Sequence, residues 1–129
     1  MASILKVDTL TGVTTAGSIS VTGEGNSTTT NLQQGLIKFW MQANLTTTSY
    51  DDSFNASSAT DTATGELTSA FVSNFSNANY SITGAANTGD AGVYNGAQTT
   101  NQWRTNMRNE SNASADASFA GYMIAGDLA

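Results

Sequence analysis

Short apolar runs separated by polar turn residues recur about every ten residues from residue 35 to the C-terminus. The strong helix formers Leu, Glu, Lys, Arg and Gln are scarce, whereas the chain holds 20 Thr, 15 Ser and 13 Asn. Thr, Ser, Asn and Gly favour turns and strands over helix interiors. We therefore expect an all-β protein, in which residues 35–129 form a small antiparallel β-sandwich-like domain of six to eight short strands.

The segment 35–45, GLIKFWMQANL, is the best candidate strand. One side would carry Ile37, Phe39, Met41 and Ala43, and the other would carry Leu36, Lys38, Trp40 and Gln42. Both sides hold large apolar groups, so we expect both to be covered at least in part. A helix is the competing interpretation, but the adjacent aromatic residues and the glycine start favour a strand.

The stretch 52–71, DSFNASSATDTATGELTSAF, predicts two strands joined by a turn at 61–65, with Phe54 pointing inward. Gly65 suits a turn position that needs φ > 0. Residues 71–79 should form a connection anchored by aromatic side chains. A strand at 79–86 should place Tyr80 and Ile82 on one face. The last strand, in SFAGYMIAGDLA, should separate Phe119, Gly121 and Met123 from Tyr122 and Ile124.

Residues 1–34 form a separate polar block. A short strand is expected at 4–10, where ILKVDTL alternates, and another at 18–22, followed by a flexible loop at 23–31. Nothing in this block could form a core alone. We interpret it as an extended arm that docks onto another chain, and the alternative interpretation is a frayed tail. The expected domains are thus 1–34 and 35–129.

The net charge of −6 argues against nucleic acid and anionic membranes as partners, because both attract basic surfaces. The chain has no cysteine and no histidine, so thiolate zinc sites and histidine-activated nucleophiles are excluded. Asp51 and Asp52 are adjacent and are interpreted as surface residues, not as a catalytic pair. We assign no catalytic residue, metal ligand or cofactor. A calcium ion in a loop remains open, although no EF-hand spacing exists.

The aromatic and amide side chains of the last third are candidates for recognising a host-surface glycan or protein. These are Tyr94, Asn95, Trp103 and Arg104. Aromatic rings stack on sugars while amides bind hydroxyl groups. The alternative interpretation is that Trp103 and Met107 fill a core or a subunit interface.

Three runs, KFWMQA at 38–43, DSFNASSATDTATGELT at 52–68 and FSNANYSI at 75–82, closely resemble a domain common in phage tail fibres. The family pattern runs approximately KAWVNF, SFNVSSITDNGTGDYTVNF and MPNANYxV, in this order and with similar gaps. The closing IAGDLA is similar to the end of such domains, and ASILKVDTL at 2–10 resembles the first residues of short structural proteins of marine phages. Ser76 stands where the family has proline, Ala56 and Ala59 replace larger residues, and 87–115 has no counterpart.

The resemblance implies a virion protein that is made in the cytoplasm of an infected bacterium and forms a homotrimer. Its expected function is that of a short tail fibre or spike that contacts the host, and the alternative is a capsid head fibre or decoration protein. A depolymerase is disfavoured because site residues are missing. The virion-docking candidates are Ile4, Leu5, Val7 and Leu10. The expected core and trimer-interface residues are Ile37, Phe39, Trp40, Met41, Phe54, Tyr80 and Ile82.

Overall fold

The computed structural model describes residues 4–13, 19–22, 29–32, 35–88 and 98–128. Among them it contains nine strands, all in antiparallel sheets, and no helix, which confirms the all-β prediction. The chain divides into two compact units, Met1–Leu36 and Ile37–Ala129. We describe each unit by itself.

The first unit contains a single small hairpin within its described residues. It pairs β1 (Ser20–Thr22) with β2 (Thr29–Asn31). The strand expected at 4–10 is wrong, because residues 4–13 pair with no strand in the described part of the chain. Alternating side chains are not enough for a strand, since its backbone groups need a neighbour to bond. The loop expected at 23–31 was also too long, because 29–31 belongs to β2.

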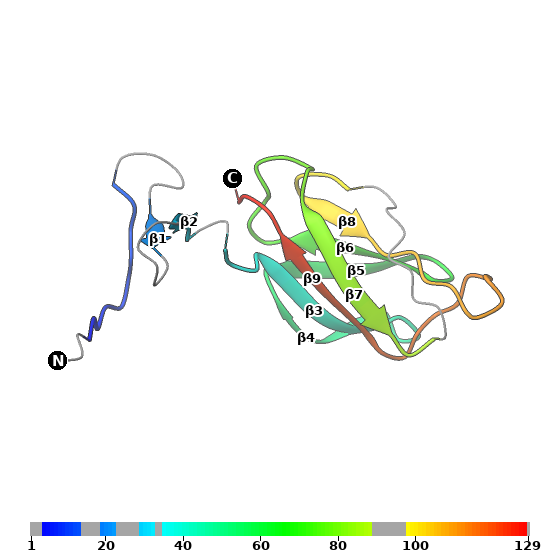
Figure 1. The fold of residues 1–129 in the computed structure, drawn as a ribbon. Coiled ribbons are helices and arrows are strands. Elements are labelled where there is room, and N and C mark those ends of the chain that lie inside the picture. The colour runs from blue at the N-terminus through cyan, green and yellow to red at the C-terminus, as the bar shows by residue number, and fades with distance from the viewer. Residues whose placement is uncertain (1–3, 14–18, 23–28, 33–34, 89–97, 129) are drawn as a thin grey trace. The chain divides into compact units, whose positions relative to one another are not determined.

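The second unit contains two antiparallel sheets (Figure 1). The larger has the order β4-β3-β9-β7, formed by Ser49–Phe54, Phe39–Asn44, Ala120–Ala125 and Ser81–Ala86. The smaller has the order β5-β6-β8, formed by Ala56–Ala63, Glu66–Phe71 and Gln102–Arg104. These seven strands agree with the predicted six to eight.

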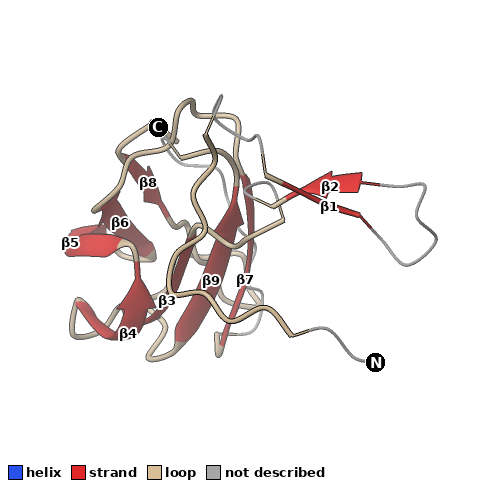
Figure 2. Cartoon of the chain, turned by 90° about the vertical axis from the view of Figure 1, so that its left-hand side faces the viewer, coloured by secondary structure: helices blue, strands red, loops and turns tan. Residues whose placement is uncertain are grey.

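The inner faces of both sheets contribute to one core, and Figure 2 shows the two layers. As predicted, Phe39, Met41 and Ala43 of β3 are buried and alternate with more exposed residues. Among the described residues, the buried apolar side chains are those of Phe39, Met41, Ala43, Leu45, Leu67, Phe71, Phe75, Tyr80, Trp103, Met107, Ala117, Ala120, Tyr122 and Ile124. Phe71 and Phe75 anchor the connection after β6, with ring centroids 4.8 Å apart.

Asn55 carries the chain from one sheet to the other, between the end of β4 and the start of β5. Its φ of 62° lies in the left-handed region, which asparagine tolerates better than most residues. Its side-chain Nδ2 donates to the carbonyl oxygens of Lys38, at 2.9 Å, and Ser73, at 3.0 Å. Its Oδ1 accepts from the Ser73 N–H at 2.6 Å. One side chain therefore fastens the crossover to two distant segments.

This crossover explains why Phe54 does not point inward as expected. The predicted strand at 52–60 is two strands, because the chain changes sheets at Asn55. Phe54 pairs with Trp40, which faces outward, and is 51% exposed. The strand expected from residue 35 begins only at Phe39, which pairs with Ile124 near the end of β9.

The predicted turn after β5 is shorter than 61–65 but keeps Gly65 at its critical position. Ala63 still pairs with Glu66, and Gly65 has φ 78°. The Gly65 N–H donates to Asp116 Oδ1 at 2.6 Å, and its carbonyl oxygen accepts from Met107 N–H at 2.7 Å. The hairpin tip is thereby held by the segment that follows β8.

Candidate functional site

Large apolar side chains gather on the outer face of the four-stranded sheet. The register places Phe54 of β4, Trp40 of β3 and Met123 of β9 side by side in a row across three strands. Phe54 is 51% exposed, Met123 is 48% exposed, and Trp40 is partly exposed. Phe119 is also exposed, and its ring end would lie 3.9 Å from a Cβ at Gly121, which places it over the same face. We call these four residues the apolar face.

One edge of this sheet is acidic. Asp51 and Asp52, both exposed, are the charged residues of β4, and β3, β9 and β7 contain none. The register between β3 and β4 shifts at this point, so that Gln42 faces Asp52 and Ala43 faces Tyr50. Asp51 is the extra residue of this bulge and accepts from Gln42 Nε2 at 3.4 Å. The bulge therefore exposes both carboxylates at the edge.

Lys38, directly before β3, is a buried base in a protein with few bases. Only 5% of the residue is exposed, and its N–H donates to the Ile124 carbonyl oxygen at 3.0 Å. Burial lowers the pKa of the Lys38 ammonium group, and the negative charge of Asp127 opposes this by raising it. The negative charge of Asp127 therefore partly compensates the positive charge of Lys38 within the same chain.

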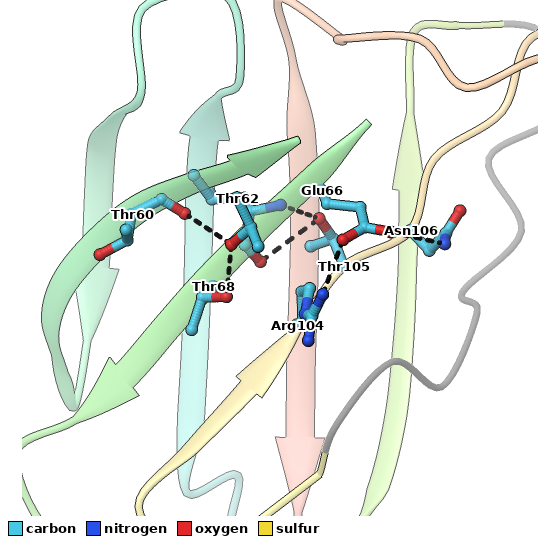
Figure 3. Close-up of polar contacts among 8 residues, drawn as sticks. Thr60, Thr62, Glu66, Thr68, Arg104, Thr105 and Asn106 are labelled. Atoms are coloured by element: carbon cyan, nitrogen blue, oxygen red, sulfur yellow. Dashed lines mark hydrogen bonds and ion pairs between the residues drawn. The ribbon is translucent and has the colours of Figure 1, made fainter. Parts of the chain in front are cut away.

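The outer face of the three-stranded sheet is polar instead (Figure 3). Arg104 of β8 donates from Nη1 to Glu66 Oε2 at 2.8 Å, and Asn106 donates to Glu66 Oε1 at 3.3 Å. Next to them, the hydroxyl groups of Thr62 and Thr68 lie 2.8 Å apart. The cluster holds a single carboxylate that is already paired, so it does not provide the two separate carboxyl groups of a glycoside hydrolase.

Of the predicted recognition residues, Trp103 and Arg104 lie in the described part of the chain, and Tyr94 and Asn95 lie outside it. Trp103 is fully buried, at 0% exposed, and contacts Tyr122 with ring centroids 4.9 Å apart. A buried indole offers no surface to a receptor, so the position of Trp103 corrects that expectation and favours the core interpretation. Arg104 is on the opposite face of β8 and is held by Glu66.

Two buried polar atoms near this contact, Trp103 Nε1 and Tyr122 Oη, have no hydrogen-bond partner among the residues that the structure describes. Tyr122 is 2% exposed, and burial raises the pKa of its phenol to about 12. Its ring packs over Gly84 of β7, where a Cβ would fall inside the ring's contact distance and 2.6 Å from the Gly121 carbonyl oxygen. Gly84 therefore makes room for Tyr122.

The residues expected in the core or trimer interface fall into two groups. Phe39, Met41 and Tyr80 are buried, and Ile82 packs against the core. Ile37, Trp40 and Phe54 reach the surface, with Ile37 44% exposed. In the first unit the docking candidates Ile4, Leu5, Val7 and Leu10 are all more than half exposed.

Sequence reasoning did not single out Met123, Phe119 or Glu66 as surface candidates. The sequence signal for the first two was present, because they alternate with the buried Tyr122 and Ile124. That these two residues lie near Trp40 could not be predicted from the sequence, since it depends on the pairing of β3 with β9. Glu66 becomes notable only when β8 pairs with β6 and brings Arg104 to it.

No group of three or more possible metal-ligating side chains occurs among the described residues. The same residues include no helix long and apolar enough to cross a membrane. In comparisons with known proteins, no family model, no curated protein and no solved structure matches the chain.

Proposed function

We propose that the chain is a structural protein of a phage virion, a short trimeric tail fibre or spike. Residues 1–34 dock onto another virion protein, and residues 35–129 present a β-domain to a glycan or protein of the host surface. The observation that carries this proposal is the ordered resemblance over residues 38–82. Its motif residues lie in β3, the end of β4, β5, β6 and the connection that leads into β7, and so in strands of both sheets.

The exposed apolar residues of the first unit support the docking part of the proposal. Ile4 is 78% exposed and Leu5 is 79% exposed, and the hairpin beside them has strands of only three residues. An isolated two-stranded hairpin is marginally stable in water. Such a unit gains order by burying its apolar side chains against another surface.

The second candidate function is a capsid head fibre or decoration protein. The same exposed residues favour it, because an apolar arm could equally bind a capsid shell. The two candidates share the virion location and the division of labour between arm and β-domain. They differ in the partner of the arm.

Imaging of intact particles by electron cryomicroscopy tests the proposal, with particles lacking this protein as the matched control. Density that is missing from the tail of the control supports the fibre, and density missing from the shell supports the decoration protein. Identical particles would overturn both. Release of reducing sugar from host polysaccharide by the purified protein would favour an enzyme instead.

A further inference from the structure

We infer that the apolar face formed by Phe54, Trp40, Met123 and Phe119 is the surface through which three copies of the chain pack around a common axis. This inference rests on the trimeric assembly proposed above and names the interface that this assembly uses. The residues come from β4, β3 and β9 and from the segment before β9, so the surface crosses the centre of the sheet.

The outer faces of the two sheets differ in polarity, so exposed apolar side chains are not a general feature of this domain's sheets. On the three-stranded sheet the corresponding outward positions carry Thr60, Thr62 and Thr68, with an ion pair between Arg104 and Glu66. The chain can therefore form a solvated sheet face from hydroxyl groups. On the four-stranded sheet it places two aromatic rings and a methionine in one row instead. Burying the exposed parts of these side chains against another copy favours association, because apolar surface is removed from water.

The charges at the two edges of this sheet favour a closed ring of copies over a two-fold pair. Asp51 and Asp52 lie on the edge strand β4, whereas the opposite edge strand β7, with the sequence SITGAA, carries no charge. In a closed ring β4 of one copy meets β7 of the next, so no carboxylates face one another. A two-fold contact between two β4 edges would bring four carboxylates together, which is unfavourable.

The first test measures the native mass of the full chain by light scattering. The 13.3 kDa chain should give about 40 kDa as a trimer. The double variant Phe54→Ser/Met123→Ser should fall to the mass of one chain at the same concentration. Both residues are about half exposed, so the fold should persist by circular dichroism. The control is Val72→Ser, which removes an apolar side chain that is 68% exposed and lies outside this sheet.

The outcomes separate this inference from the proposed assembly. A wild-type chain that stays a monomer overturns the trimer itself. A wild-type trimer that the double variant leaves intact overturns the apolar face and leaves the trimer standing. A dimer of about 27 kDa overturns the three-fold arrangement. If the double variant unfolds, acrylamide quenching of Trp40 decides, because a trimer through this face must shield Trp40 as concentration rises.

A second test addresses the meeting of β4 and β7. Thr83→Asp places a carboxylate on the uncharged edge, beside Met123 in the register. In the proposed ring it would face the acidic edge of the next copy, so the trimer should dissociate at low salt and recover at high salt. Thr60→Asp on the other sheet is the control and should change nothing. An intact Thr83→Asp trimer at low salt would overturn the ring order.

Discussion

The hydroxyl groups of the buried tyrosines Tyr80 and Tyr122 differ in their hydrogen bonding. Tyr80 Oη donates to the carbonyl oxygens of Thr99 or Gln102, each at 3.1 Å. Tyr122 Oη is buried and has no hydrogen-bond partner within the described part of the chain. A buried hydroxyl without a hydrogen bond destabilises the folded state, whereas a bonded one contributes to its stability.

The first prediction compares the two deletions of a hydroxyl group. Tyr80→Phe should lower the free energy of unfolding by about 1 kcal/mol, because the single phenol proton no longer bonds the carbonyl oxygen of Thr99 or Gln102. Tyr122→Phe should leave the free energy of unfolding unchanged or raise it by up to about 1 kcal/mol. Urea denaturation of both variants and the wild type measures the difference. A larger loss for Tyr122→Phe than for Tyr80→Phe would show that its hydroxyl is bonded in solution.

The second prediction concerns alkaline pH. Burial is the main cause that raises the pKa of both Tyr80 and Tyr122 to about 12, from 10.0 in an unfolded chain. The folded state therefore holds these protons more tightly than the unfolded state. The resulting stability is complete below pH 10 and is lost as the pH rises towards 12. The loss should be on the order of 3 kcal/mol per tyrosine.

Urea denaturation at several pH values between 9 and 12 measures this dependence. Tyr122→Phe serves as its control, because it removes one of the tyrosines whose pKa burial raises and should reduce the slope. Tyr50, whose pKa burial also raises, keeps contributing in this variant. A wild-type stability that stays constant over this range would show that the buried phenols ionise as freely as exposed ones.

At the scale of elements, Asn55 decides where one strand ends and the next begins. The third prediction is that Asn55→Ala lowers the free energy of unfolding by about 2–4 kcal/mol. The variant loses the hydrogen bonds to Lys38 and Ser73 and places alanine at φ 62°. Asn55→Gly keeps the backbone freedom and should lose less. Thermal unfolding of both variants measures the effect, and equal losses would mean that the backbone conformation contributes nothing.

The local part of this fold could be read from the sequence. The alternation in β3 and β9 correctly separates buried Phe39 and Tyr122 from their more exposed neighbours, because a strand's two faces follow from its own residues. The face of Phe54 could not be read in this way. It depends on the change of sheet at Asn55 and on pairing with Trp40, which are tertiary events.

The candidate site was likewise predictable only where it depends on the residues of a single strand. The sequence placed large apolar groups on both sides of the segment around Trp40, and the structure leaves Trp40 partly exposed. That Met123 lies next to Trp40 depends on a pairing between strands that are far apart in the chain. The predicted recognition role of Trp103 was wrong for a related reason. A tryptophan in a polar stretch resembles a surface residue until β8 pairs with β6 and turns its ring into the core.

At the scale of the whole molecule, the two units differ in what stabilises them. In the described parts of the chain, every buried apolar residue of the core belongs to the second unit, from Phe39 to Ile124. Val13 of the first unit is 94% exposed, and Val21 in β1 is 51% exposed. The second unit therefore contains its own core, whereas the described apolar residues of the first unit remain at the surface.

The last prediction is that a chain lacking residues 1–34 folds and no longer joins the particle. Its free energy of unfolding should stay within about 0.5 kcal/mol of that of the full chain, because no core residue is removed. Circular dichroism and urea denaturation measure the fold, and co-sedimentation with particles that lack the protein measures attachment. The full chain is the control for both. An unfolded shorter chain would show that the first unit contributes to the core, and a shorter chain that still attaches would place the docking surface in the β-domain.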